Sequence, residues 1–332
     1  MKSLGKFARV LKLVLIYFVV MIVFVSCGED EKENPNGNGD NKFSWDSNVD
    51  VYSVGYEIDD GQNKLVLWKN DQQQTLENNV VLSHSRAASV FVNGNDVYVA
   101  GYVNERAVLW KNGAKQELGD YPSQALSVFV DGNDVYVAGR HSSDARVLLW
   151  KNGMQQTLVD SIGGAYSVFV HNGDVYVGGF TIIDYYSCPA YWKNGGLNVL
   201  SITTSNASAS VVNSIFADNN NVYAAGGPYN RGVLWTNGTP DTLSTSSYLQ
   251  SVFVYNGDVY AIAPGPALFK NKVKQTLESG WTPSELYVSN NNVYICGQDN
   301  YRAVLYKNGI KKYLGKDNSE SMATAIFVKA KY

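Results

Sequence analysis

The side chains that could perform acid–base or nucleophilic chemistry in this chain are few. Among its 332 residues are three histidines, His84, His141 and His171. Neither His84 nor His141 has a serine, cysteine or acidic partner in a recognisable catalytic arrangement. No H-E-x-x-H, Walker or EF-hand string occurs. We therefore predict no catalytic residue, no metal site and no cofactor.

A basic residue recurs four positions before a repeated aromatic residue. These bases are Lys64, Arg106, Arg146, Arg231 and Arg302. Cations at one height of a repeated fold could form a basic collar for an anionic ligand such as a uronic-acid glycan. In the structural alternative, each base bonds loop carbonyls or an acid such as Asp144. The structural alternative is favoured because the bases follow the repeat, and the collar is kept as a candidate binding site.

Several aromatic residues interrupt the repeat. Tyr185 and Tyr186 lie in the longest insertion, and Trp281 lies in the segment SGWTPS. Flat apolar rings with polar edges suit a carbohydrate or peptide surface. We predict a loop position for Trp281 and name all three as candidate ligand-binding residues. In the alternative interpretation, such loop aromatics only cover the core.

These residues belong to a chain that repeats itself. SVFVNGNDVYVAG, from Ser89, recurs as SVFVDGNDVYVAG from Ser127, and RAVLWKNGAKQEL, from Arg106, recurs as RVLLWKNGMQQTL from Arg146. The aromatic residue of the second segment is found at Trp68, Trp110, Trp150, Trp192, Trp235, Phe269 and Tyr306. Successive aromatics are 42, 40, 42, 43, 34 and 37 residues apart, which is typical of propeller blades.

Each repeat divides into four short strands. In the first complete copy we expect strands at 89–92, 96–101, 107–111 and 114–118, with Asn112-Gly113 forming a tight hairpin. The first repeat lacks its first strand, and the residues from Thr324 onward supply one. The sequence therefore predicts an all-β, seven-bladed propeller over residues 47–332, with four antiparallel strands per blade. The ring would be closed by the C-terminal strand pairing with the N-terminal blade.

The repeated aromatic position accepts Trp, Phe or Tyr, so we predict that it belongs to the core. The connections after the second and fourth strands vary in length, and they emerge on one side, which we call the loop-rich face. The short turns after the first and third strands define the plain face. Function is expected on the loop-rich face, because binding residues gather on loops carried by a rigid scaffold.

The N-terminus has the pattern of an export signal. Basic residues precede an uncharged apolar run from Leu13 to Val25, which ends in FVSC. This resembles a bacterial lipobox, which implies a signal peptide at 1–26 and lipidation of Cys27. Residues 27–46 read as a flexible tether whose acidic cluster resembles the surface-export signal of Bacteroidetes lipoproteins. The alternatives are a secretory signal with an incidental cysteine and a merely solvated linker.

The charge of the mature chain argues against nucleic-acid binding. Removing residues 1–26 takes away four of the 27 basic side chains and none of the 30 acidic ones, which leaves a formal net charge of −7. Cys188 and Cys296 fall in different repeats, so we expect no disulfide between them.

The mature chain resembles Bacteroidetes-type surface lipoproteins whose propellers are built from VYVAG…LWKNG repeats. The resemblance implies a monomeric outer-membrane lipoprotein exposed at the cell surface. We predict a non-catalytic binding protein that takes carbohydrate or another extracellular polymer on its loop-rich face. The alternatives are a protein-interaction scaffold in an outer-membrane complex and, third, a hydrolase or lyase that uses His84, His141 and loop acids.

Overall fold

The structure is a computed structural model that describes residues 43–201 and 210–331. The predicted signal peptide (1–26), the predicted lipidation of Cys27 and most of the predicted tether (27–46) lie outside these residues. The described residues form 27 β-strands and one 3-10 helix, Leu82–His84, so the all-β class is confirmed for them. No helix in the two described ranges is long and apolar enough to cross a membrane.

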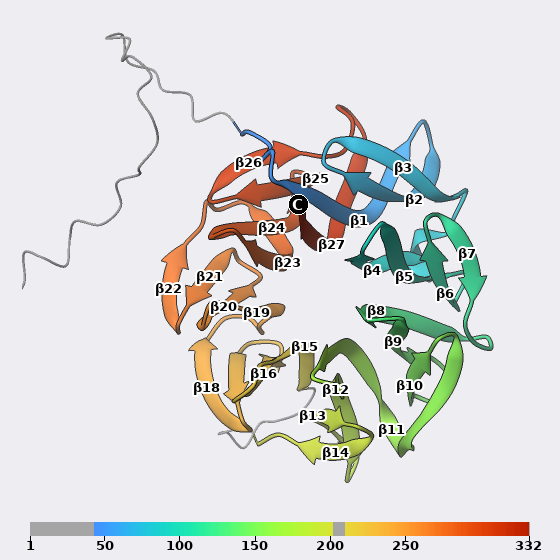
Figure 1. Cartoon of the computed structure of the whole chain (residues 1–332), viewed down its shortest axis with the longest axis vertical. Coiled ribbons are helices and arrows are strands. Elements are labelled where there is room, and N and C mark those ends of the chain that lie inside the picture. The colour runs from blue at the N-terminus through green and yellow to red at the C-terminus, as the bar shows by residue number, and fades with distance from the viewer. Residues whose placement is uncertain (1–42, 202–209, 332) are drawn as a thin grey trace, which may run out of the picture. The chain divides into compact units, whose positions relative to one another are not determined.

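The strands form antiparallel sheets arranged around a central axis (Figure 1). Four of the sheets have four strands that follow chain order outward from the axis. They are β4(Arg86–Asn93), β5(Asp96–Val103), β6(Arg106–Lys111) and β7(Ala114–Glu117); β15(Val211–Ala217), β16(Val222–Gly227), β17(Gly232–Thr236) and β18(Thr239–Ser244); β19(Ser251–Tyr255), β20(Asp258–Ala263), β21(Ala267–Lys270) and β22(Val273–Thr276); and β23(Trp281–Ser289), β24(Asn292–Asp299), β25(Arg302–Lys307) and β26(Ile310–Tyr313). Radial four-stranded sheets of this kind define a β-propeller.

A fifth four-stranded sheet joins the two ends of the described chain. Its strands, in order outward, are β27(Glu320–Ala330), β1(Val49–Asp59), β2(Gln62–Lys69) and β3(Gln72–Asn78). β27 pairs with β1 from Val49↔Ala330 to Ile58↔Glu320. The predicted pairing of the C-terminal strand with the N-terminal sheet is therefore confirmed.

The sixth sheet has seven strands because one strand is shared. Its members are β8(Ser123–Asp131), β9(Asp134–His141), β10(Arg146–Lys151), β11(Met154–His171), β12(Asp174–Ile183), β13(Tyr186–Lys193) and β14(Gly196–Val199). Residues 154–157 of β11 pair with β10, whereas residues 163–171 pair with β12. β11 thus lies outermost beside β10 and innermost beside β12.

The repeated aromatic residues belong to the core, as predicted. Their side chains are at most 2% exposed at Trp68, Trp110, Trp150, Trp192, Trp235, Phe269 and Tyr306. Each belongs to a cluster of buried aliphatic residues; Trp110, for example, packs with Val54, Leu65 and Val90. The position selects bulk rather than a particular hydrogen bond, since the indole nitrogens of Trp110, Trp150 and Trp192 have no partner among the described residues.

The DVY and WKN motifs lock the hairpins of the plain face. In the β5–β6 hairpin, Asn112 Oδ1 accepts the Val97 N–H at 2.8 Å, and its Nδ2 donates to Asp96 at 2.7 Å. Lys111 pairs with Asp96 at 2.8 Å and lies over the Tyr98 ring. Hydrogen bonding to Lys111 and Asn112 lowers the pKa of Asp96. The most visible part of the repeat is thereby explained by local structure.

The glycine of VYVAG accommodates a β-bulge in the innermost strand. In β4, Ala87 pairs with Gly101 and Ser89 pairs with Ala100, so Ala88 is left unpaired. A Cβ atom on Gly101 would lie 2.1 Å from the Arg86 carbonyl oxygen. The copy that ends at Ala263 has alanine instead of this glycine, and its innermost strand β19 begins at Ser251, so its pairing with β20 stops short of the bulge position. The bulge aims an extra side chain at the end of the central channel.

The two described cysteines, Cys188 and Cys296, are free thiols, which agrees with the predicted lack of a disulfide between them. Cys296 is fully buried in the core.

Candidate functional site

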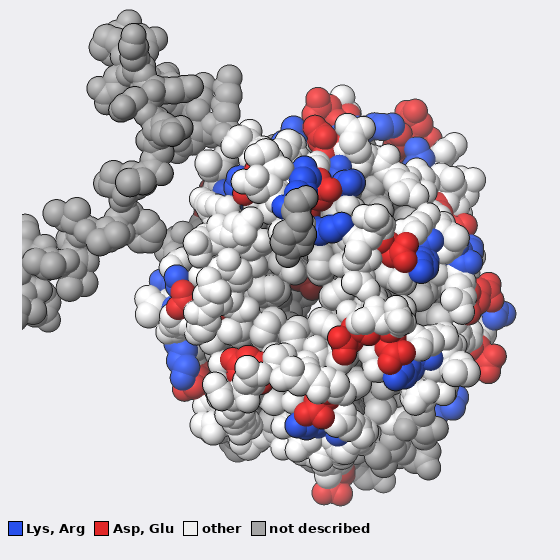
Figure 2. Space-filling model, in the orientation of Figure 1, with Lys and Arg blue, Asp and Glu red and all other residues white. Residues whose placement is uncertain are grey.

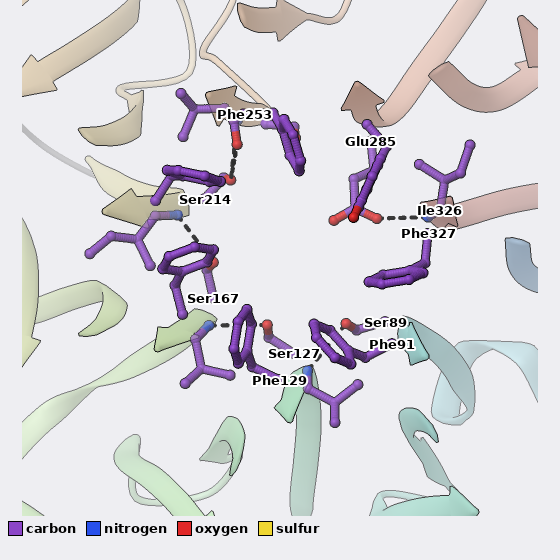
Figure 3. Close-up of a pocket in the computed structure, with 18 of the residues that line it drawn as sticks. Ser89, Phe91, Ser127, Phe129, Ser167, Ser214, Phe253, Glu285, Ile326 and Phe327 are labelled. Atoms are coloured by element: carbon purple, nitrogen blue, oxygen red, sulfur yellow. Dashed lines mark hydrogen bonds between the residues drawn. The ribbon is translucent and has the colours of Figure 1, made fainter. Parts of the chain in front are cut away.

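The innermost strands enclose a central channel with two rings of side chains (Figure 3). Side chains alternate between the two faces of a strand, so the valines of SVFV face the core while its serine and phenylalanine face the channel. The space-filling view shows a hollow at the centre of the ring, with most charged atoms lying away from it (Figure 2).

The ring nearer the plain face is aromatic. Its members are Phe91, Phe129, Phe169, Phe216, Phe253, Tyr287 and Phe327. Neighbouring ring centroids lie 4.3–5.3 Å apart, and the contact of Phe327 with Phe91 at 4.8 Å closes the circle. These rings line an apolar cavity of about 320 Å³ inside the channel.

The second ring consists of serine hydroxyls that join neighbouring innermost strands. Its serines are Ser89, Ser127, Ser167, Ser214 and Ser251. Each hydroxyl oxygen accepts the backbone N–H of an innermost strand farther along the ring, as Ser127 does from Val168 at 3.0 Å. The serine of SVFV is thereby explained as an acceptor between innermost strands. The Ser214 hydroxyl also donates, to the Val252 carbonyl oxygen at 3.4 Å, whereas the other four serine hydrogens have no acceptor among the described residues.

Glu285 takes the place of a serine in this ring. Its Oε2 accepts the Ile326 N–H at 2.7 Å, as a serine would, and the other oxygen remains in the channel (Figure 3). Desolvation raises the pKa of Glu285 to about 7, because the single backbone hydrogen bond offsets little of the cost of burying its charge. The channel thus contains one carboxyl that changes charge near neutral pH.

The raised pKa makes stability depend on pH. The folded protein binds this proton more tightly than the unfolded chain, so the stabilising contribution is present below about pH 4.5 and is lost as pH rises through 7. Relative to Glu285→Gln, the wild type should lose about 3 kcal/mol of unfolding free energy between pH 4.5 and 8. Chemical denaturation of both proteins across this range measures the difference. Parallel pH profiles would contradict the raised pKa.

The channel opens on the loop-rich face into a polar cavity of about 240 Å³, which we call the mouth. Residues at or beside the bulges line it, namely Ala88, Leu126, Tyr166, Asn213, Gln250, Ser284 and Thr324. The serine ring and Glu285 form its floor. Ser284 is 6% exposed, and its hydroxyl has no hydrogen-bond partner among the described residues. A buried polar group of this kind requires a partner, and in the mouth a ligand can supply one.

Arg86 lies at the edge of the mouth and forms no ion pair with any residue of the two described ranges. Together with Thr324 it also lines a neighbouring cavity of about 490 Å³ between β27–β1 and β4. Tyr56, Tyr102 and Glu320 contribute to the walls of that cavity. A ligand seated in the mouth could therefore extend past Arg86 into a second hollow.

The structure does not bring the five collar cations together in one site. They stand at or just before third strands of different sheets, and none lines the channel or the mouth. Lys64 pairs with Asp59 at 3.2 Å, Arg146 with Asp144 at 2.6 Å and Arg302 with Asp317 at 2.7 Å. Arg106 lies over the Tyr121 ring, whereas Arg231 has no ion pair among the described residues. The geometry favours the structural alternative.

The loop position predicted for Trp281 is wrong. Trp281 begins β23, is 4% exposed and stacks on Tyr306 at 4.0 Å between ring centroids. Tyr306 replaces the larger repeated tryptophan, and the Trp281 indole fills the adjoining volume in the same core cluster. Trp281 is therefore not a ligand-binding candidate.

Tyr185 and Tyr186 lie at the β12–β13 turn, where their side chains are 100% and 61% exposed. Neither lines the channel or the mouth. Their predicted ligand contact stays a prediction.

Histidine–acid pairs occur at the end of β9 and in the connection before β4, and no described histidine lines the mouth. His141 Nδ1 lies 2.6 Å from Asp144, and His84 Nε2 lies 3.6 Å from Glu105. Ser83 Oγ is 3.2 Å from His84 Nδ1, but His84 is 53% exposed at the surface. No group of three or more metal-binding side chains occurs in the described part of the chain.

Sequence reasoning missed Glu285 and the two rings, although a signal was present. The copy ELYVSNNNVYICG has Glu285 where Ser89, Ser127 and others stand. A charge inserted into an otherwise apolar and hydroxyl-bearing inner strand marks a position whose chemistry departs from the repeat.

No protein-family model matches the sequence, and no curated protein matches it. Among solved structures, the chain is similar to the extracellular domain of the hybrid two component system BT4673 from B. thetaiotaomicron, with 13% identity and a TM-score of 0.50. The match covers 77% of this chain but only 38% of that one. The chain is also similar to the WD40 propeller domain of Doa1, with 16% identity, a TM-score of 0.49, and 74% and 89% of the two chains covered. The likeness to the BT4673 domain concerns the fold alone.

Proposed function

We propose that this protein is a non-catalytic binding protein whose ligand enters the mouth on the loop-rich face. The ligand class is carbohydrate, presented as a free sugar or as the end of an extracellular polymer. The observation that carries the proposal is the buried, unpartnered Ser284 hydroxyl in a cavity lined by Asn213, Gln250 and the serine ring. Sugar hydroxyls both donate and accept hydrogen bonds, so they can satisfy such groups together.

We also propose a cellular location for the protein and a number of blades for its propeller. A lipid on Cys27 would anchor the protein in the outer membrane, with the propeller facing the outside of the cell. The predicted export signal supports this location. Division of the seven-stranded sheet at β11 would give seven blades of four strands. The closed circle of seven aromatic residues supports that number.

A glycan array followed by calorimetry tests the proposal. We expect at least one saccharide to bind, and Ser284→Ala combined with Gln250→Ala to weaken it about tenfold or more, because each lost hydrogen bond costs about 1 kcal/mol. Ser210→Ala removes another buried hydroxyl, one that has no partner among the described residues and does not line the mouth, so it is the control. Absence of saccharide binding, or equal effects of the two changes, would contradict the proposal.

A further inference from the structure

The mouth combines one free cation with a set of unused hydrogen-bond donors. Among the described residues, Arg86 is the cation that lines this cavity, and it forms no ion pair. By contrast, Lys64, Arg146 and Arg302 at the outer strands are neutralised by nearby carboxylates. A guanidinium left unpaired beside a cavity is suited to bind a carboxylate through parallel N–H groups.

The floor of the mouth presents donors as well. The oxygens of Ser89, Ser127, Ser167 and Ser251 already accept backbone N–H groups, and their own hydrogens have no acceptor among the described residues. These serines border both the mouth and the deeper channel, so their hydrogens can reach a guest in either cavity. The Ser284 hydroxyl adds a further donor from the wall.

We infer that the saccharide recognised at the mouth is a sugar acid, whose carboxylate is held between Arg86 and the serine hydroxyls. This inference rests on the proposed function and specifies the ligand class of the same site. The mouth volume of about 240 Å³ suits one terminal sugar, and the cavity beyond Arg86 and Thr324 offers room for its neighbour. Recognition is therefore directed at the end of an acidic chain.

The affinity of the mouth for a sugar acid depends on whether Glu285 is protonated. When ionised, it places a negative charge in the cavity that receives the ligand carboxylate, and the two like charges repel each other in a site partly shielded from water. When neutral, it carries an O–H that can donate to the ligand. Binding of the sugar acid therefore favours protonated Glu285, and the complex takes up a proton at pH values where free Glu285 is ionised.

The other titratable groups facing Glu285 do not reproduce this pH dependence. Burial raises the pKa of Tyr287 to about 12. Burial also raises the pKa of the Cys296 thiol, opposite Glu285 on β24. Glu285 is thus the group in these cavities that changes charge near pH 7.

Calorimetry with matched sugars tests the inference. Glucuronate and galacturonate are compared with their neutral amides and with glucose, at pH 6 and pH 8, using the purified protein. We expect the acids to bind at least tenfold more tightly than the amides at pH 6. The affinity for the acids should fall toward pH 8, by at most tenfold per pH unit, because one proton is linked to binding. Titrations in buffers of different ionisation enthalpy should show proton uptake at pH 7–8.

Two variants test the contributions of the Glu285 carboxyl and the Arg86 guanidinium to binding. Glu285→Ser restores the residue of the other copies and can still accept the Ile326 N–H, so it should fold and bind the acids with little pH dependence. Arg86→Gln should weaken the acids about tenfold and leave the amides unchanged. Equal binding of acids and amides, or a pH dependence that persists in Glu285→Ser, would overturn the sugar-acid inference while the proposed function stands. Binding of no saccharide by the folded protein would overturn both.

Discussion

Replacing Trp110 by alanine should lower the free energy of unfolding by about 3–5 kcal/mol. The Trp110 indole, on β6, is fully buried among Val54, Leu65 and Val90. Val54 and Leu65 belong to β1 and β2 of the adjacent sheet, and Val90 belongs to β4 of the same sheet as Trp110. Removal of the indole would leave a cavity at the contact between two sheets, where rigid strands can collapse little. The indole nitrogen has no partner among the described residues, so the loss is one of packing and not of a hydrogen bond.

Chemical denaturation of Trp110→Ala and the wild type measures this effect. Tyr185→Ala is the control, because that side chain is fully exposed and its loss should change stability by about 0.5 kcal/mol or less. Below its unfolding transition, Trp110→Ala should retain ligand affinity, since Trp110 does not line the mouth. A variant as stable as the wild type that has lost binding would reverse the assignment of this residue to the core.

The second large effect is expected at the bulges. In Gly139→Ala, the new Cβ would lie 1.9 Å from the Gln124 carbonyl oxygen, a backbone atom that cannot move without disturbing the β8–β9 pairing. Such overpacking should cost about 3 kcal/mol, measured as the change in unfolding free energy. The mouth should also change shape, because the bulged residue of β8, Leu126, contributes to its wall.

Ala263→Gly is the matched control for this prediction. It makes the opposite change at the equivalent position of the copy whose innermost strand begins after the bulge position. Its cost should be about 1 kcal/mol or less, from the added backbone freedom of glycine in the unfolded chain. Equal losses in the two variants would show that the repeated glycine is not selected by the bulge.

The propeller architecture could be predicted from the sequence because its repeats are local. Each DVY…WKN hairpin is determined by residues within about one repeat, such as Asp96, Lys111 and Asn112, so strand order and turn positions follow from the pattern. The closing strand could be foreseen because the first copy lacks a strand that the last residues supply. Trp281 was misplaced because its burial depends on Tyr306 in another strand, a contact that a local pattern does not contain.

The candidate site could be predicted only in part. The sequence predicts a binding site on the loop-rich face, where the mouth opens. The loop aromatics and collar cations proposed as its residues, however, do not line the channel or the mouth. The rings arise from residues contributed by sheets far apart in the sequence, for instance Phe91 and Phe327. Their convergence is a property of ring closure and cannot be read from a single repeat. Only Glu285 could be recognised from the sequence, because it replaces the serine of the other copies.

Ligands are proposed to bind in the mouth and not on the exposed side chains of Tyr185 and Tyr186. The most direct measurement compares, by calorimetry, the affinity of one array-identified saccharide for two double variants. Ser284→Ala with Gln250→Ala should weaken binding about tenfold or more, whereas Tyr185→Ala with Tyr186→Ala should leave it unchanged. Full binding by Ser284→Ala with Gln250→Ala, together with loss of binding by Tyr185→Ala with Tyr186→Ala, would contradict binding in the mouth.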